Sequence, residues 1–363
     1  MNTPSVIVCL GAGGVGKTTV ASVVALHHAL AGQKTLVITL DPARRLMDAL
    51  GIKGKGHKPK RVDLAPFMGA DAKKSGALYA YMPDLKKEWM DFLTAAIERE
   101  SVQKKIATNH FYQHMAEGIP GSLEIIASHV LFRIMDEDDY DIIILDTPPA
   151  SHSVSFLDVP RKIIAVLEES IFQKLMDRRH SFLLNITKKI AFFSGGLIES
   201  TFERLIGSHF LSELLDFALT IDGLYAPMLK RARAMDELLH HAKTRYFLVA
   251  RPTRASALGV SSCIDTLQAR GLSLSQIVIN QLMSPIDDDV LQQEFMSLSE
   301  AQREMIGPTI DDYKRQQSYE KRLVSTMLLA AHDTPACRLY KEPDHNRINL
   351  LKGLLTHYER GAH

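Results

Sequence analysis

The sequence is poor in cysteine, and the few thiols are far apart. Its 363 residues include three cysteines, Cys9, Cys263 and Cys337, and no two of them form a CxxC pair. A structural zinc site or a disulfide scaffold needs clustered thiols, so we expect neither. Sparse thiols are typical of a reducing compartment, and we therefore expect a cytoplasmic protein.

Strong net charge and long apolar runs are also absent. The formal net charge is +1 at pH 7. This near balance argues against a binder that relies on a basic surface, so we expect no specific nucleic-acid partner. No apolar run approaches the ~18 residues that span a bilayer. The N-terminus has no basic region and no cleavage site, so we expect no signal peptide.

The sequence alternates short apolar runs with helical patterns. Strand patterns occupy 5–10, 34–42, 77–84, 140–149, 244–252 and 276–283. Such alternation predicts an α/β fold with a doubly wound, mostly parallel sheet. A helical stretch rich in Leu, Phe and Met interrupts the pattern. We therefore predict a core in two parts, 1–159 and 244–363, around a helical insertion at 160–243.

Chemically reactive or polar segments follow the apolar runs SVIVCL, VITL, DIIIL and IVI of four predicted strands. They are GAGGVGKTT at 11–19, DPARR at 41–45, DTPPASH at 146–152 and NQL at 280–282. In a doubly wound sheet, ligands bind beyond the carboxyl ends of the parallel strands. We therefore expect the four segments to converge on one binding site.

The first segment matches the phosphate-loop pattern GxxxxGK[ST] and lies between a predicted strand and a predicted helix. A chance glycine turn would not account for those flanking elements. Glycines let backbone N–H groups turn towards phosphate oxygens, and a helix N-terminus favours an anion. Lys17 would reach the β- and γ-phosphates, and the Thr18 hydroxyl would ligate Mg²⁺. The predicted ligands are ATP and Mg²⁺, and the nucleotide-binding residues are Gly11, Ala12, Gly13, Gly14, Val15, Gly16, Lys17, Thr18 and Thr19.

Two acidic residues end predicted strands. Asp146 follows an apolar run, which suits a carboxylate that holds Mg²⁺; the alternative is an Asp that caps the next turn. Asp41 would position or deprotonate the attacking water, and with Lys17 it forms the predicted catalytic pair. The alternative for Asp41 is an N-cap, because Asp-Pro often begins a helix.

Five ordered motifs resemble those of the ArsA/Get family of anion-transporting ATPases, relatives of the MinD/ParA group. They are GGVGKTT at 13–19, LDPA at 40–43, PGxxE at 120–124, DTPPASH at 146–152 and INQL at 279–282. The resemblance implies a P-loop NTPase of the deviant Walker A type, with one switch around Asp41 and another containing His152. It also implies that Asn280 hydrogen-bonds the adenine edge. The motifs look closest to a bacterial branch of paired, unequal paralogues.

Ala12 departs from the family pattern. The family's loop is usually KGGVGKT, and its first lysine reaches across a dimer to the partner's nucleotide, which Ala12 cannot do. Loss of a charge that stabilises the transition state slows hydrolysis. The resemblance therefore implies either a slow homodimer or a heterodimer with a lysine-bearing paralogue. Arsenite is disfavoured as cargo because the thiols are not clustered.

The resemblance leaves three uses of a nucleotide switch open. One is a transport or targeting ATPase whose apolar segment at 160–243 binds a hydrophobic protein client, although ordinary core and dimer interface would also explain that segment. Another is a positioning ATPase of the MinD/ParA kind. The third is a weakly catalytic regulatory subunit. GTP is disfavoured because the guanine motif NKxD is absent.

The last predicted helix, at 347–360, is amphipathic. Its apolar face would carry Ile348, Leu351, Leu354, Leu355 and Tyr358. A membrane surface could take up such a face, as in the tail of MinD-like ATPases, and the protein would then be peripheral. Docking of the helix on its own domain is the preferred alternative.

Overall fold

The structure is a computed structural model. It describes residues 4–41, 43–52, 58–68, 75–96, 122–137, 139–147, 155–168, 226–285, 288–332, 334–341 and 347–361. The chain divides into two compact units: unit 1 comprises Met1–Pro83, Met135–Ser155 and His240–His363, and unit 2 comprises Asp84–Ile134 and Phe156–Leu239. Most of the predicted insertion lies outside the described residues, so its boundaries stay a prediction.

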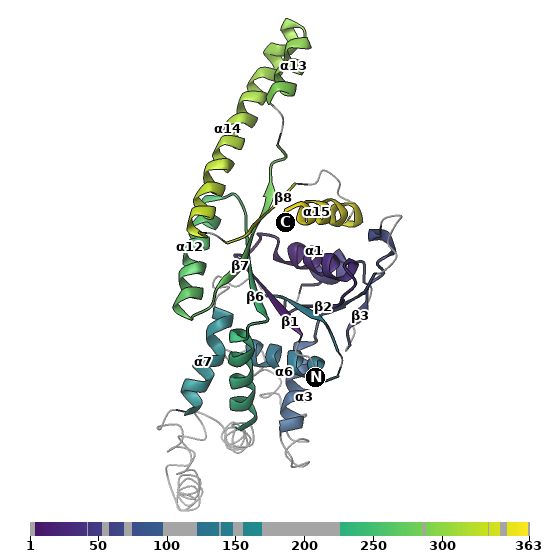
Figure 1. Ribbon diagram of the computed structural model, residues 1–363, viewed down its shortest axis with the longest axis vertical. Coiled ribbons are helices and arrows are strands. Elements are labelled where there is room, and N and C mark those ends of the chain that lie inside the picture. Colours follow the sequence, from purple (N-terminus) through teal and green to yellow (C-terminus); the bar gives the residue numbers. More distant parts are fainter. Residues whose placement is uncertain are drawn as a thin grey trace, which may run out of the picture. The chain divides into compact units, whose positions relative to one another are not determined.

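Unit 1 is built on an eight-stranded sheet with the order β3-β4-β2-β5-β1-β6-β7-β8 (Figure 1). The strands are β1 Ser5–Leu10, β2 Lys34–Thr39, β3 Lys60–Arg61, β4 Ala77–Tyr81, β5 Ile142–Asp146, β6 Thr244–Ala250, β7 Leu274–Leu282 and β8 Ala336–Tyr340. Among the strands that the described residues form, only the pair β3–β4 is antiparallel. The mostly parallel α/β fold is therefore confirmed.

The central strands are apolar and buried along their length. All of β5 and all of β1 beyond its first residue are buried, as expected for strands covered on both faces. The register pairs Asp146 with Cys9 of β1 and with Thr39 of β2. Three strands thus end at the same level of the sheet, which places their following residues side by side.

The helices of unit 1 are α1 Lys17–Leu30, α2 Arg45–Ala49, the 3-10 helix η1 Ala65–Phe67, α12 Arg254–Ala269, α13 Asp288–Ser297, α14 Glu300–Ala330 and α15 Arg347–Gly361. Unit 2 contains α3 Leu85–Ala96, most of α6 Ser122–Glu137 and of α7 Ser155–Glu168, and most of a helix over 226–240. Among the described residues, no helix is both long and apolar enough to cross a bilayer.

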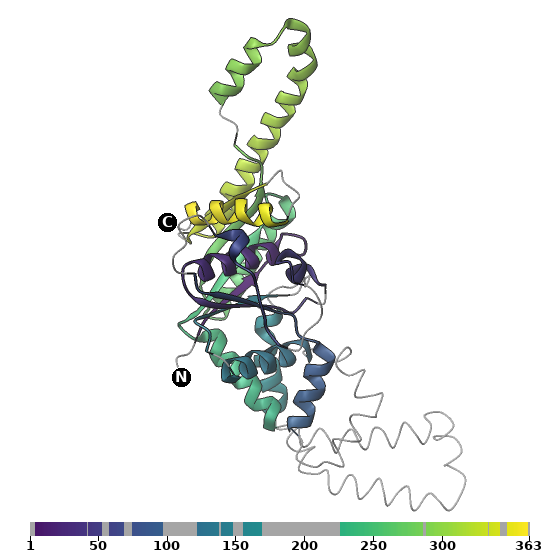
Figure 2. The ribbon, with the colours of Figure 1, turned by 90° about the vertical axis from the view of Figure 1, so that its right-hand side faces the viewer.

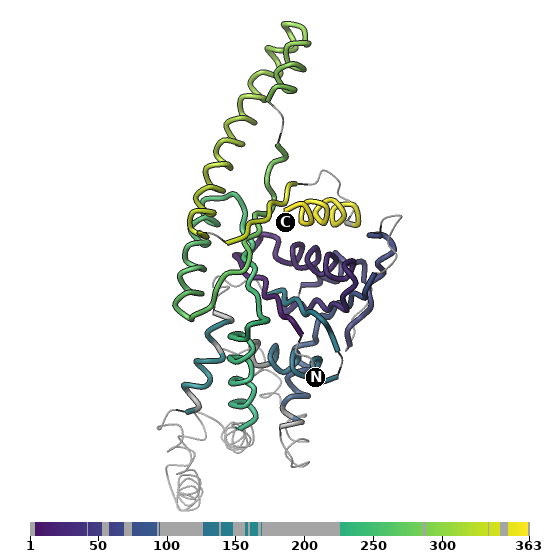
Figure 3. The backbone as a smooth tube through the Cα atoms, viewed as in Figure 1, coloured from purple at the N-terminus to yellow at the C-terminus, as the bar shows by residue number. Residues whose placement is uncertain are grey.

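The sequence did not predict the hairpin of α13 and α14. The two helices follow one another between β7 and β8 and run in opposite directions (Figure 2), and the tube in Figure 3 traces the chain through them. The Tyr313 hydroxyl donates to the Ser284 carbonyl at 2.5 Å near the base of the hairpin. Only three of the 31 residues of α14 are buried, so it has no continuous apolar stripe that would reveal it in the sequence.

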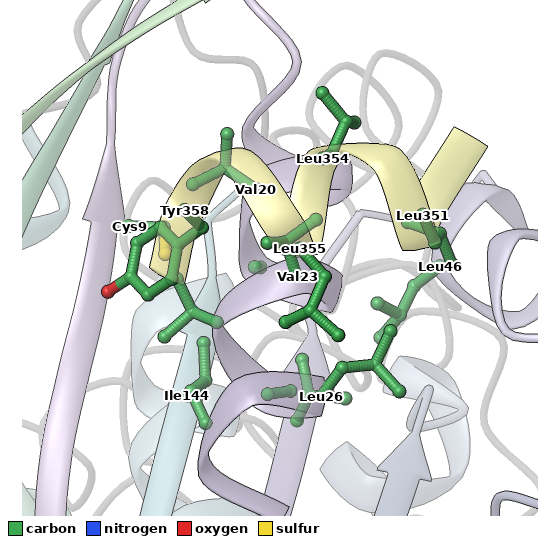
Figure 4. Packing of buried hydrophobic residues seen from close by; sticks show 14 of the residues in the cluster. Cys9, Val20, Val23, Leu26, Leu46, Ile144, Leu351, Leu354, Leu355 and Tyr358 are labelled. Carbon is green, nitrogen blue, oxygen red and sulfur yellow. The ribbon is translucent and has the colours of Figure 1, made fainter. Parts of the chain in front are cut away.

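Helix α15 docks on α1 and β8. Its residues Leu351, Leu354, Leu355 and Tyr358 are buried in the core beside side chains of α1 (Figure 4). Ile348 remains 39% exposed. The docked alternative is therefore confirmed, because the apolar face that a membrane would take up is buried within unit 1.

Candidate functional site

Described residues of the four polar segments, which follow β1, β2 and β5 and form the end of β7, lie close together in unit 1. The Thr147 hydroxyl, just beyond β5, donates to the Cys9 carbonyl at 2.7 Å. The Asn280 amide nitrogen, in β7, donates to the Val15 carbonyl of the phosphate loop at 3.0 Å. The convergence that the strand ends predict is thus present in the described residues.

Two glycines of the phosphate loop, Gly11 and Gly16, lie so close to neighbouring atoms that any larger residue would push those atoms away. Gly11 lies so close to β6 that an added Cβ would be 2.3 Å from the Val249 carbonyl oxygen. Gly16 precedes α1 with a φ of 91°, and an added Cβ there would be 2.3 Å from Asn280 Nδ2. The loop therefore depends on left-handed backbone and close approach, which glycine alone supplies.

Lys17 folds back into this loop. Its side chain is buried, and Nζ donates to the carbonyl oxygens of Gly11 at 2.9 Å and Ala12 at 3.0 Å. Burial is the main influence on the ammonium and lowers its pKa. The loop thus holds a buried cation beside the N-terminus of α1, an arrangement that attracts an anion.

Asp146 connects the loop to β2. The hydroxyls of Thr18 and Thr39 both donate to its Oδ2 atom, at 2.8 and 2.9 Å. Its Oδ1 atom is buried and has no hydrogen-bond partner among the residues that the structure describes. Burial raises the pKa of Asp146 from 3.8 to about 6, although the two hydroxyls act in the opposite direction.

An oxygen-rich set of this kind fits Mg²⁺. The unpartnered Oδ1 of Asp146 and the Thr18 hydroxyl are hard oxygen donors, and Mg²⁺ is usually held by one or two such groups together with substrate phosphates. Within the described residues, no cluster of three or more His, Cys, Asp or Glu side chains could hold a metal by itself. The protein groups therefore suit a metal that arrives with a nucleotide.

Asp41 is buried just beyond the end of β2. Its Oδ1 atom accepts a hydrogen bond from the Ala43 N–H at 2.9 Å, and its Oδ2 atom lies 3.6 Å from Arg45 Nη1. The Asp41 N–H donates to the Thr39 hydroxyl at 3.2 Å, which links Asp41 to the Asp146 network. Helix α2 begins after Arg44, so the alternative that Asp41 is its N-cap is wrong.

Asn280 is nearly inaccessible to solvent and holds the phosphate loop against β7. While Nδ2 donates to Val15, Oδ1 accepts from the Gln281 N–H at 2.9 Å, and Gln281 has a φ of 62°. The second amide hydrogen of Asn280 is not used in these bonds. A contact with adenine stays a prediction.

Sequence reasoning missed two residues of the site, Thr39 and Arg251. Thr39 bonds Asp146, and Arg251 follows β6 and directs Nη1 towards the Gly14 carbonyl at 3.5 Å. The rule of strand ends would have found Arg251, because it is the first residue beyond β6. Nothing in the sequence marks Thr39 as a residue of the site, since threonine is common in apolar strands.

Several predicted features lie outside the described residues. They include Pro120 and Gly121 of the PGxxE element and everything beyond Thr147 in the DTPPASH segment, His152 among them. Glu124 belongs to α6, but its side chain is not described.

The three thiols are buried and separate. All three cysteines are free. Burial raises the pKa of Cys263 to about 12 and of Cys337 to about 11, and it also raises the pKa of Cys9. A thiol that stays protonated is a poor metal ligand and a poor nucleophile.

The sequence matches a known family over most of its length. The family model described as anion-transporting ATPase covers residues 4–329. The chain belongs to the anion-transporting ATPase family. This confirms the resemblance to ArsA/Get proteins, and as in other members the activity is that of an ATPase with a nucleotide substrate.

Relatives in this family are distant in sequence, and the matches cover different shares of their length. ATPase ASNA1 homolog 1 of Paramecium tetraurelia is 26% identical over 286 residues, which cover 76% of this chain and 74% of the relative. ATPase GET3 of Malassezia globosa is 25% identical over 279 residues, 77% of this chain and 73% of the relative. A protein of Halobacterium salinarum, provisionally described as an arsenical pump-driving ATPase, is 29% identical over 230 residues, 63% of this chain and 32% of its own length.

Proposed function

We propose that this ATPase is a Mg²⁺-dependent molecular switch whose nucleotide state controls a dimer and a protein client. The supporting observation is the Asp146 carboxylate, which accepts hydrogen bonds from Thr18 and Thr39 and has one buried oxygen without a partner in the described ranges. A buried carboxylate oxygen without a partner is costly in a protein interior. A bound cation would offset that cost.

In this proposal the residues of the site divide the binding of Mg·ATP among them. The loop amides and Lys17 bind the phosphates, and Lys17 exchanges the Gly11 and Ala12 carbonyls for phosphate oxygens. Thr18 and Asp146 hold Mg²⁺, which when bound neutralises negative charge on the phosphates. Asn280 fixes the loop and binds the adenine edge.

Asp41 is the proposed catalytic carboxylate. It would orient the attacking water and accept its proton, because it is buried and its backbone is tied through Thr39 to the metal-binding carboxylate. Hydrolysis would then alter the segments 41–45 and 146–158, which flank the phosphates. Movement of these segments would pass the nucleotide state to the dimer and the client.

The client is proposed to be a hydrophobic protein segment rather than arsenite. All three thiols are buried, with raised pKa values, so they are unsuited to a soft metalloid. A membrane-positioning role is less well supported, because the apolar face of α15 is buried. The proposed assembly is a homodimer or a heterodimer with a related ATPase.

A second candidate follows from Ala12, which is exposed at the tip of the phosphate loop. Without a lysine there, the chain would be a weakly catalytic subunit that is activated by a lysine-bearing paralogue. ATP turnover of the pure protein, measured alone and with that paralogue, separates the two candidates. Brisk turnover by the chain alone excludes the second.

The proposed chemistry is tested by Asp41→Asn, a change that keeps the size of the side chain. We expect Mg·ATP affinity within about threefold of wild type and a fall in single-turnover hydrolysis of roughly 100-fold or more. Unchanged hydrolysis would remove Asp41 from catalysis. Failure of both proteins to bind Mg·ATP would contradict the proposed function itself.

A further inference from the structure

Arg251 lies at the phosphate loop although no loop or switch motif contains it. It directly follows β6, the neighbour of β1 on the side away from β5. The approach is close, because the Val249 carbonyl near the end of β6 leaves no room for a side chain at Gly11. The backbone of Arg251 therefore lies beside the phosphate loop.

The backbone of Arg251 is firmly held. Its N–H donates to the Ser256 hydroxyl at 3.0 Å, and its carbonyl accepts from the Thr253 N–H at 2.7 Å. Thr253 is also the N-cap of α12, where its side chain accepts from the Ser256 N–H. Strand and helix thus fix the direction in which the arginine leaves the sheet.

The guanidinium has far fewer partners than it can take. It carries five N–H donors. One of them makes a long contact of 3.5 Å with the Gly14 carbonyl, whereas Nε is buried and has no hydrogen-bond partner within the described part of the chain. By comparison, Arg133 and Arg161 in unit 2 form ion pairs with carboxylates. A planar cation with unused donors, half-buried beside a phosphate loop, fits an anion with several oxygens.

We propose that Arg251 is a phosphate-binding residue of this chain's own nucleotide site. It would place a guanidinium on the phosphates at the tip of the loop, where Gly14 and Ala12 are exposed to solvent. The inference rests on the proposed function, since it assumes that the loop binds a nucleotide. It also gives this ATPase a source of positive charge in the same chain, at a loop that lacks a lysine at position 12.

The test uses the full-length protein and two ligands, Mg·ATP and inorganic triphosphate, in calorimetric titrations. Arg251→Ala should lower the affinity for both ligands by the same factor, roughly 10- to 100-fold, as expected when hydrogen bonds to a charged group are lost. Arg251→Lys should recover part of the affinity, because it keeps the charge but not the fork of donors. Arg245→Ala is the matched control, since Arg245 lies in β6 near the opposite end of the strand.

Each outcome distinguishes the inference from the proposed function. The inference is overturned if Arg251→Ala binds both ligands like the wild type, if it weakens ATP alone, or if Arg245→Ala weakens binding as much. Lys17→Ala is included as the reference for the loop. If the wild type binds neither ligand, the proposed function itself is wrong. If Lys17→Ala loses affinity and Arg251→Ala does not, only the inference about Arg251 is wrong.

Discussion

Replacing Asp146 by asparagine should make the ligand-free protein more resistant to rising pH. Burial raises the pKa of this carboxyl from 3.8 to about 6 in the folded state. An acid whose folded-state pKa is raised stabilises the fold at low pH, and that contribution is lost as pH rises from about 4 to about 6. The ionised carboxylate is thus held in the fold at a cost, which Asp146→Asn removes.

The magnitude follows from linkage. With a pKa of 3.8 in the unfolded chain and about 6 in the folded one, the carboxyl costs roughly 2 kcal/mol at pH 5 and roughly 3 kcal/mol at pH 8. The free energy of unfolding of the wild type should therefore fall by roughly 1 kcal/mol relative to that of Asp146→Asn between these pH values. The difference between two pH values cancels any cost of the asparagine that does not depend on pH.

The assay is urea unfolding of both proteins at pH 5 and pH 8 with a metal chelator present. Asp139→Asn is the control for the loss of a carboxylate, because Asp139 is exposed shortly before β5, the strand that ends at Asp146. In parallel, Asp146→Asn should lose most of the Mg²⁺-dependent gain in ATP affinity. A stability difference that is the same at both pH values, or that shrinks as pH rises, would refute the reasoning.

Three further predictions concern the loop and the core. Gly16→Ala should greatly weaken ATP binding, because the added Cβ would clash with the side-chain amide nitrogen of Asn280. Gly271→Ala is the control: φ is 69° there and the space around it is open, so this variant should lose only about 1–2 kcal/mol of stability in urea unfolding. Leu355→Ala should lower the free energy of unfolding by about 2–5 kcal/mol, and the half-exposed Ile348→Ala by much less. Ala12→Lys should raise steady-state ATP turnover if the missing charge limits a homodimer; unchanged turnover would exclude that explanation.

Sequence patterns predict the elements that carry strong local signals. Strands β1 and β5 are continuous apolar runs, and α1 follows a glycine-rich loop, so each was expected close to its observed bounds. The hairpin of α13 and α14 was not expected, because its residues are mostly exposed and Pro308 lies inside α14. Strand β8 has only five residues, and the exposed Arg338 lies between two buried ones, so its sequence also lacked a clear strand pattern.

The candidate site was predictable where motif and strand end coincide. Lys17 and Thr18 belong to a loop pattern, and Asp41 and Asp146 lie at or just beyond the ends of strands that the register brings together. The partners of those residues were not predictable. The Thr39 hydroxyl in β2 donates to Asp146 in the neighbouring strand β5, and this contact depends on the register of the two strands and not on any local pattern.

The central claim is that the phosphate loop binds Mg·ATP through Lys17. Calorimetric titration of Mg·ATP into the wild type and Lys17→Ala tests it most directly, with unfolding curves to show that both proteins are folded. We predict a single site per chain in the wild type and a loss of affinity of roughly 100-fold or more in the variant. Equal affinity in the two proteins would contradict the account.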